Sequence, residues 1–264
     1  MDTPAILRVT HVGAATMLLE LGSLRLLTDP VFDAADTKYS FGYGTHSQKT
    51  SGPAMAAADI GRIDAVLLSH DHHGDNLDDA GRRLLPAARV VLTTVAGAAR
   101  LGGNARGLPA WHEHRLLGAD GFSLRVTATP ARHGPPLARF LVGEVTGFLL
   151  EAPELTGGAI YITGDTVWHR RLTEIGRGWR IGTAFFHMGQ ASFGSTGPIR
   201  YTMSAKGAVK LARALQPARV VPIHYEGFSH FAEGRAEIER AFDAAGLSAL
   251  LYWLPLGKET IVPC

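Results

Sequence analysis

Cysteine is nearly absent from this chain. Its 264 residues contain one, Cys264, which is the last residue. A single thiol excludes a disulfide framework within the chain and suits a reducing compartment. We therefore expect a cytoplasmic protein.

Long apolar runs and basic clusters are also missing. No apolar run approaches the roughly 18 residues of a membrane-spanning helix, and the first residues lack the basic start and long apolar core of a secretory signal. The net charge is +2, and the arginines are scattered along the chain. We therefore expect no stable membrane insertion and no nucleic-acid partner, and favour a small-molecule substrate. The sequence leaves a homo-oligomer open.

The chain instead has many short apolar runs separated by turn residues. Hydrophobic residues make up 46% of it and charged residues 19%, as in ordinary globular proteins. The runs predict a strand meander followed by strand–helix units, and the same plan is then repeated without a linker. This order favours one domain, residues 1–264, with an α/β fold of four layers: two mixed sheets with helices outside, αββα. Residues 33–53 are predicted to be a long loop, residues 202–217 a helix capped by Thr202 or Ser204, and residues 249–255 a last strand.

Polar residues fall at the carboxyl ends of four predicted strands. His70 and His72 follow one strand, and His133, Asp165 and His224 each follow another. Ligands distant in sequence can meet at such strand ends. Imidazoles with carboxylates and no thiolate suit Zn, Fe, Mn or Ni. A hydrolytic site of this kind also leaves one coordination position open for water, whose pKa the ion lowers to about 7.

These motifs resemble those of the metallo-β-lactamase superfamily. The segment "SHDHHGDN" (69–76), with the later "RHG", "TGDT" and "PIHY", is similar to the superfamily signature His-x-His-x-Asp-His followed by distant His, Asp and His. The opening "THVGAATMLLELGSLRLLTDPVF" (10–32) is similar to the branch that holds the ascorbate-phosphate lactonases and the phospholipase D acting on N-acyl-phosphatidylethanolamine. The resemblance extends from about residue 9 to residue 230.

The resemblance implies a centre with one or two zinc ions, with Mn²⁺, Ni²⁺ or Fe²⁺ as alternatives. Asp165 would bridge two ions, and Asp75 would also accept a proton from the attacking water. Asp29 would support the histidine loop by hydrogen bonds and would not be a ligand. The implied metal ligands are His70, His72, Asp75, His133, Asp165 and His224.

The sequence departs from the signature in two ways. One extra residue separates His72 from Asp75, and Asn76 stands where the superfamily usually has histidine. An amide oxygen is a poor zinc ligand, so the second site is predicted to be weak or to recruit another group. His187, which closes a strand, is the favoured recruit; a contact with substrate or a developing oxyanion is equally open, which would make it catalytic together with Asp75.

Two other histidines lie close to the motifs. His73 is expected to be an outward-pointing neighbour of the ligands. His230 lies a few residues after the strand-end histidine "PIHY", and the sequence leaves open whether it forms a pocket wall or only packs.

We therefore predict a metal-dependent hydrolase in which a metal-bound hydroxide attacks an ester, lactone or phosphodiester. A carboxylic ester or lactone is favoured, because Arg132 and Arg200 are the only obvious phosphate-binding residues in the motif loops. Two alternatives stay open: a metal-binding regulatory or sensor protein with slow catalysis, which the asparagine motivates, and an iron-dependent redox protein of the same fold.

Overall fold

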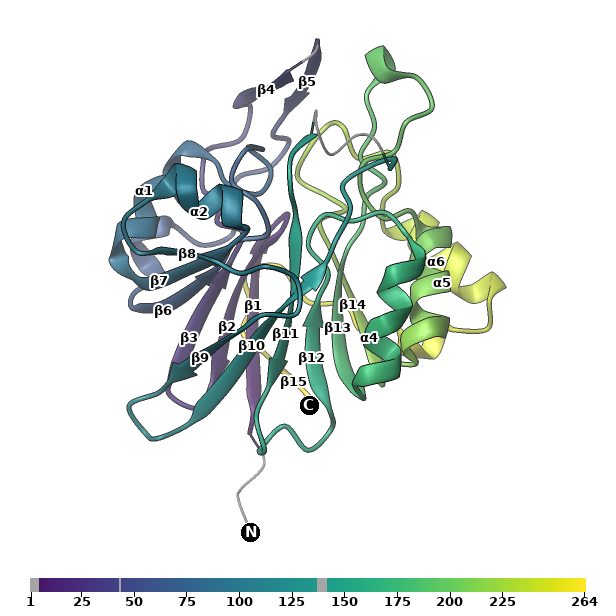
Figure 1. The fold of residues 1–264 in the computed structure, drawn as a ribbon. Coiled ribbons are helices and arrows are strands. Elements are labelled where there is room, and N and C mark those ends of the chain that lie inside the picture. Colours follow the sequence, from purple (N-terminus) through teal and green to yellow (C-terminus); the bar gives the residue numbers. More distant parts are fainter. Residues whose placement is uncertain (1–4, 43, 137–141) are drawn as a thin grey trace.

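Two large β-sheets lie face to face in the computed structural model, which describes residues 5–42, 44–136 and 142–264 (Figure 1). The first sheet has the strand order β15-β1-β2-β3-β6-β7-β8 in this part of the chain. It opens with the predicted meander, and β3, β6, β7 and β8 then run parallel. Its strands are β1 (Leu7–Gly13), β2 (Thr16–Leu21), β3 (Leu24–Thr28), β6 (Ile63–Leu67), β7 (Ala88–Thr93), β8 (Ala105–Gly107) and β15 (Thr260–Val262).

The second sheet has the order β14-β13-β12-β11-β10-β9. Strands β12, β13 and β14 are parallel, and β9 to β11 are antiparallel. Every residue of β13 is buried, as expected for a strand covered on both faces. The strands are β9 (Glu113–Leu117), β10 (Ser123–Pro130), β11 (Thr146–Glu151), β12 (Ala159–Ile162), β13 (Ile181–His187) and β14 (Arg219–Ile223).

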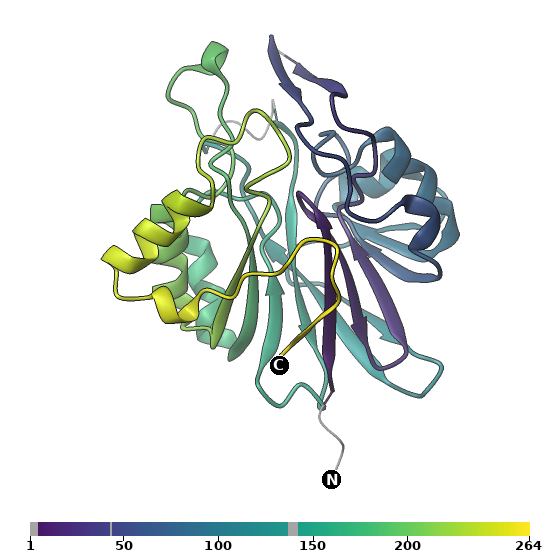
Figure 2. The same cartoon turned by 180° about the vertical axis from the view of Figure 1, so that it is seen from behind.

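The helices cover the outer faces of both sheets (Figures 1 and 2). Helices α1 (Asp79–Leu84) and α2 (Val95–Leu101) lie outside the first sheet, and α4 (Thr173–Gly178), α5 (Ala205–Leu215) and α6 (Arg235–Ala244) lie outside the second. Helix α5 starts as predicted, because Ser204 Oγ accepts a hydrogen bond from the Gly207 amide at 3.1 Å. The predicted four-layer αββα fold is confirmed.

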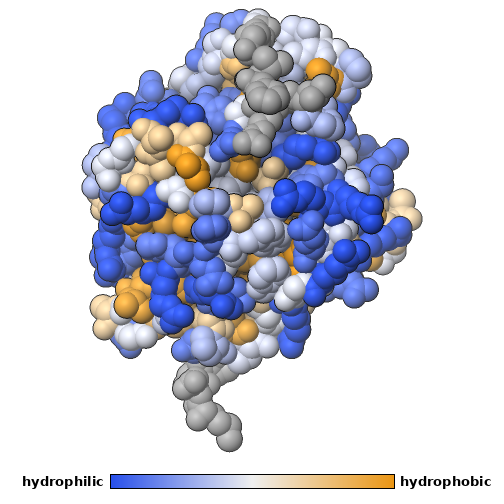
Figure 3. Space-filling model, in the orientation of Figure 1, coloured by the Kyte–Doolittle hydropathy of each residue, from blue (hydrophilic) through white to orange (hydrophobic). Residues whose placement is uncertain are grey.

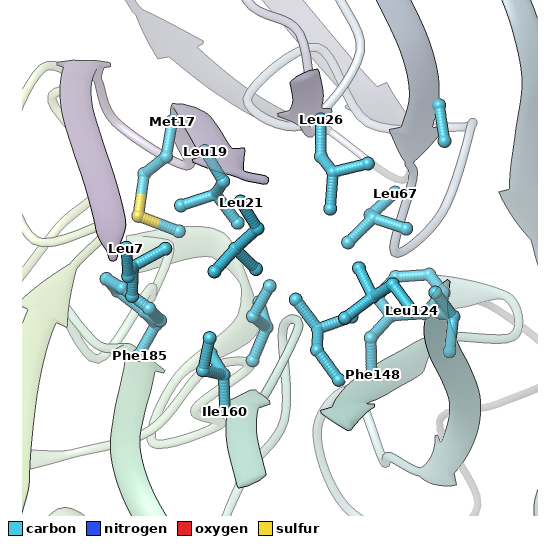
Figure 4. Close-up of a cluster of buried hydrophobic side chains, with 14 of the residues drawn as sticks. Leu7, Met17, Leu19, Leu21, Leu26, Leu67, Leu124, Phe148, Ile160 and Phe185 are labelled. Atoms are coloured by element: carbon cyan, nitrogen blue, oxygen red, sulfur yellow. The ribbon is translucent and has the colours of Figure 1, made fainter. Parts of the chain in front are cut away.

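The main hydrophobic core fills the space between the sheets. In Figure 4, Leu19 and Leu26 of the first sheet lie opposite Phe148 and Ile160 of the second, and all four are fully buried or nearly so. Burying a side chain of this size stabilises the fold by about 1.5–3 kcal/mol. The core therefore fixes the two sheets against each other and with them the strand ends that carry the polar residues.

Two predictions from local pattern were wrong. Residues 33–53 contain a hairpin, β4 (Lys38–Gly42) and β5 (Thr45–Gln48), and not only loop; Tyr43 at its turn lies outside the described residues. The apolar run 249–255 forms a 3-10 turn and one bridge from Leu251 to Val220, and the last strand is β15, paired with β1. The run packs its side chains against the second sheet and α6 without forming a ladder.

The outer surface carries no conspicuous apolar area in the view of Figure 3, where a mainly hydrophilic face is interrupted by small apolar areas. This is the usual composition of a protein surface. Among the described residues, no helix has the length and apolar character needed to cross a membrane.

Candidate metal centre

The carboxyl ends of β6, β10, β12 and β14 lie at one end of the paired sheets (Figure 1). His70 follows β6, His133 follows β10, Asp165 follows β12 and His224 follows β14. All four side chains are buried. Side chains from both sheets thus meet at this end, where the sequence predicted a centre.

Three imidazoles converge on the side nearest β6 and β10. His73 Nδ1 lies 3.0 Å from His70 Nε2 and 3.0 Å from His133 Nε2. Two nitrogens bound to one tetrahedral zinc ion lie roughly 3.3 Å apart, given Zn–N distances of about 2.0–2.1 Å. Burial is the main cause that lowers the pKa of all three histidines, so they are neutral at pH 7 and their lone pairs are free to bind a metal.

His73 is a correction to the sequence interpretation. It was expected to point outward, yet it is only 9% exposed and faces His70 and His133. Of the neighbours His72 and His73, it is His72 that is exposed, and its Nε2 contacts the carbonyl oxygen of Val142. The loop after β6 is not a strand, so alternation of side chains does not apply to it. Ligand atoms of His70, His72 and His73 still lie within 4.8 Å of one another, so His72 borders the same cluster.

Hydrogen bonds to the far nitrogens orient two of these rings. His133 Nδ1 donates to the carbonyl oxygen of Tyr201 at 2.7 Å, which leaves Nε2 as the free nitrogen. His70 Nδ1 lies 2.9 Å from Ser69 Oγ. Asp29 Oδ1 accepts the amide of Ser69 at 2.7 Å, the supporting contact that the resemblance implied. Such partners fix the tautomer and direction of metal-binding histidines.

A second cluster, richer in carboxylates, lies beside the imidazoles. Ligand atoms of Asp75, Asp165 and His224 lie within 4.8 Å of one another. His224 stands between the acids, with Nε2 3.4 Å from Asp75 Oδ2 and Nδ1 3.4 Å from Asp165 Oδ1. Ligand atoms of Asp165 also lie within 4.8 Å of those of His70 and His133, so this carboxylate is placed between the two clusters.

The polar atoms of this second cluster lack hydrogen bonds. Both oxygens of Asp165, Oδ1 of Asp75 and both ring nitrogens of His224 are buried without a hydrogen-bond partner among the described residues. Burial alone would lower the pKa of His224, but Asp165 and Asp75 raise it to about 9. Without a metal, the single imidazolium of His224 thus faces two buried carboxylates, and buried charge is costly unless an opposite charge compensates it. The residues here therefore fit a divalent cation.

His187, the favoured recruit, is not grouped with either cluster, and Asn76, which was expected to be a poor ligand, contacts Ser69. His187 is fully buried, with Nε2 3.1 Å from Asp29 Oδ2 and Nδ1 3.3 Å from Thr163 Oγ1. Both of its nitrogens are engaged and the ring lies outside the lining of the cavity described below, so its contacts support Asp29. Asn76 donates through Nδ2 to Ser69 Oγ at 3.3 Å, and its Oδ1 is unpartnered among the described residues.

His230 is the histidine that sequence reasoning did not assign. Its Nε2 lies 3.1 Å from Asp75 Oδ2, and its Nδ1 lies 2.6 Å from Ser47 Oγ of β5. The ring is also stacked on Phe193, at 5.2 Å between centroids and 21° between planes. The only signal in the sequence was its position six residues after His224.

A cavity of about 420 Å³ opens directly above the two clusters. The hairpin β4–β5 and the loop with the 3-10 turn Gly194–Thr196 both extend from this end of the sheets (Figure 1), and residues of both line the cavity. His73, Asp75, His133 and His230 line its floor, and its walls are mostly apolar. The wall residues are Phe41, Gly42, Thr45, Pro135, Val142, Ala191, Phe193, Thr196, Ile199 and Tyr201.

Comparison with known families shows to which family the chain belongs. The family model described as "Beta-lactamase superfamily domain" matches residues 24–225, which is more than half of the chain. The chain belongs to the metallo-β-lactamase superfamily. Among curated superfamily relatives, a UPF0173 metal-dependent hydrolase from Pelotomaculum thermopropionicum is 27% identical over 248 residues, covering 90% of this chain and 93% of its own. A similar protein from Archaeoglobus fulgidus is 26% identical, with 96% and 98% covered.

Two solved structures share this fold. The isothiocyanate hydrolase from Delia radicum gut bacteria superposes with a TM-score of 0.81 at 21% identity, covering 97% of this chain and all of its own. The metallo hydrolase Igni18 from Ignicoccus hospitalis gives a TM-score of 0.69 at 20% identity, with 97% and 98% covered. The superfamily fold thus accounts for the whole arrangement of sheets and strand ends described above.

Proposed function

We propose that this protein is a metal-dependent hydrolase that cleaves a carboxylic ester or lactone in a small, largely apolar molecule. One observation carries the proposal: a buried set of neutral imidazoles and unpartnered carboxylates forms the floor of an apolar cavity. The names of the relatives, UPF0173 metal-dependent hydrolases, support the hydrolytic assignment.

Two groups of residues would hold the metal. His70, His73 and His133 would form the histidine side, and Asp75 and His224 the carboxylate side, with Asp165 shared by both. Zinc is the favoured ion for imidazoles with carboxylates, and Mn²⁺, Ni²⁺ and Fe²⁺ suit the same ligands. When bound, such ions activate water and polarise the oxygen of the substrate.

The side chains supply positioning and proton transfer. Asp75 lines the cavity, and its Oδ1 has no hydrogen-bond partner among the described residues. This oxygen would accept a proton from the attacking water and return it to the leaving alkoxide. The ring of Phe193 is tilted against that of Phe41 and stacked on that of His230. The two phenylalanine rings would hold the apolar part of the substrate over the floor and exclude bulk water.

The charges around the cavity favour an ester or lactone over a phosphodiester. None of the described residues that line this cavity is a lysine or arginine. Arg132 lines a separate pocket, and Arg200 is exposed, with Nη1 donating to the carbonyl oxygen of Ile199. Among the described residues, an anionic substrate in this cavity would therefore find no lysine or arginine to pair with its charge.

A substrate panel with defined metals tests the proposal. Protein loaded with Zn²⁺, Mn²⁺ or Fe²⁺ is assayed with an aryl ester, a lactone, a phosphodiester and an aryl isothiocyanate, the last because a structural neighbour bears the name isothiocyanate hydrolase. We expect hydrolysis of the ester or lactone that is lost in His133→Ala and retained in His112→Ala, since His112 is exposed and outside the cavity.

Other outcomes would contradict the proposal. Faster cleavage of the phosphodiester or the isothiocyanate would replace the substrate class, and full metal occupancy without any hydrolysis would favour a sensor. Iron-dependent oxidation would favour redox chemistry; a diiron β-hydroxylase from Streptomyces venezuelae shares the fold, with a TM-score of 0.68, although this chain covers only 55% of it.

A further inference from the structure

The carboxylate side lacks the imidazole that the superfamily signature places next to its aspartate. Asn76 occupies that position, and its amide donates toward Ser69 on the histidine side. Among the described residues of the signature, His224 is then the only histidine with a ligand atom within 4.8 Å of those of both Asp75 and Asp165. One nitrogen and two carboxylates make three protein ligands, so a fourth position remains for water or for another side chain.

Of the described histidines, His230 makes the shortest contact with Asp75. It reaches Asp75 from the loop after β14, and its Nε2 is closer to Asp75 Oδ2, at 3.1 Å, than His224 Nε2 is, at 3.4 Å. The His230 side chain is only 2% exposed, and the ring lies on the cavity floor beside the unpartnered carboxylate oxygen of Asp75.

A hydrogen bond on the far side of the ring supports a ligand role. His230 Nδ1 lies 2.6 Å from Ser47 Oγ, which in turn lies 3.3 Å from Ser229 Oγ. In the tautomer that donates from Nδ1 to Ser47, Nε2 has a lone pair that faces the carboxylate of Asp75. Two acceptors at 3.1 Å repel each other unless a cation lies beside both of them. The same pattern, a hydrogen-bonded far nitrogen and a free near nitrogen, orients His133.

We infer, on the basis of the metal centre proposed above, that His230 Nε2 is a ligand of the ion held by Asp75, Asp165 and His224. His230 takes the place of the imidazole that Asn76 removes. His187 cannot do so, because Asp29 and Thr163 engage both of its nitrogens. The rival reading uses the other tautomer, in which Nε2 carries the proton and donates to Asp75, so that His230 only positions the carboxylate.

Metal stoichiometry and affinity separate these readings without an activity assay. Wild type, His230→Ala, Asn76→His and the double variant are loaded with Zn²⁺, and bound ions are measured by elemental analysis and by competition with a chromophoric chelator. His46→Ala is the matched control, because His46 is an exposed histidine on the same strand as Ser47. Circular dichroism confirms that each variant is folded.

We expect two ions in wild type and in His46→Ala, and one ion in His230→Ala. The second ion of His230→Ala should bind more weakly by over 100-fold, beyond the roughly 10–100-fold that loss of a group hydrogen-bonded to a ligand costs. Asn76→His should restore the second ion in the double variant. In protein with Co²⁺ at the second site, His230→Ala should also change the visible d–d bands.

Two results would overturn the inference and leave the proposed function intact. His230→Ala could retain two ions of wild-type affinity, or wild type could hold one ion and Asn76→His two. A weakening of 10–100-fold with unchanged d–d bands would assign the positioning role instead. A wild-type protein that is folded and binds no transition metal would overturn the inference and the proposed function together.

Discussion

The two sides of the centre are built differently. On the histidine side, His133 and His70 are oriented by the Tyr201 carbonyl and by Ser69, and burial keeps them neutral. On the carboxylate side, the ligand atoms of Asp165 and His224 have no hydrogen-bond partners among the described residues. The histidine side is thus organised by the protein itself, whereas the carboxylate side is organised around a positive charge.

Left-handed backbone conformations occur on both sides of the centre, and Asp29, which supports the histidine side, is held at φ 30°. His224 is held at φ 56°, a left-handed conformation that non-glycine residues rarely adopt, while its amide donates to the Ala14 carbonyl at 2.9 Å. Strain of this kind costs about 1–3 kcal/mol and persists where the surroundings impose it. Because its buried polar atoms lack hydrogen-bond partners among the described residues, the carboxylate side should gain more stability from metal binding than the histidine side.

Replacing Asp165 should have the largest effect, because this residue is shared by both sides. We expect Asp165→Asn to lose both ions and to lower hydrolysis by far more than the roughly 100-fold cost of a supporting group. In chelator, the same variant should be more stable than wild type by about 1–3 kcal/mol, since two buried carboxylates then no longer share the one imidazolium of His224. Elemental analysis and urea unfolding measure both effects. A metal-free variant less stable than metal-free wild type would show that Asp165 is already compensated.

Two variants that each remove one metal ligand should show that each side holds its own ion. We expect His133→Ala to lose the ion of the histidine side and His224→Ala to lose that of the carboxylate side, with one ion remaining in each. Activity should fall by about 100-fold or more in both, because the ions act on the same substrate. Loss of both ions in His133→Ala would mean that the carboxylate side depends on the first ion.

Much of this centre was predictable from local sequence, because strand ends are marked by apolar runs. His70, His133, Asp165 and His224 each follow such a run, and parallel strands bring their carboxyl ends to one edge. The αββα layers followed from the same alternation of strands and helices, and Ser204 marked the start of α5.

The remaining residues depend on contacts that no local pattern encodes. His73 is turned inward by a loop with one extra residue, and His230 is brought to Asp75 by the path of the chain after β14. His187 has the strand-end position of a ligand, but its partner Asp29 is 158 residues away. Residues 249–255 were apolar enough for a strand, yet β1 pairs with β15 from further along the chain.

Replacing His187, which supports Asp29, should weaken metal binding only on the histidine side. His187 contacts Asp29, and Asp29 holds the amide of Ser69 next to His70. We expect His187→Gln to weaken the ion of the histidine side by about 10–100-fold, with little change at the other ion. Stepwise chelator competition resolves the two affinities. Equal weakening of both ions would place His187 in a shared structural role.

The smallest effect is expected at the outer edge of the histidine loop. Burial acts to raise the pKa of Asp71, but hydrogen bonds from Arg100 at 2.8 and 2.5 Å outweigh it and hold this pKa well below its usual range. The pair therefore stabilises the fold above the unfolded pKa of about 3.9, and this contribution is lost as the pH falls below that value. Because Arg100 is half exposed, Arg100→Ala should cost about 1 kcal/mol or less at pH 7.

Urea unfolding of the metal-free proteins at several pH values tests the direction of this pH dependence. The difference between wild type and Arg100→Ala should be present at pH 7 and shrink below pH 4. A difference that grew on acidification would contradict the assignment.

The most direct test of the central claim is an anomalous difference map from crystals of the zinc-loaded wild-type protein, recorded at the zinc absorption edge. The account predicts two peaks: one among His70, His73 and His133, and one among Asp75, His224 and His230, with Asp165 between them. A map without a peak at these residues, or with a single peak bound by His72 in place of His73 and without His230, would contradict it.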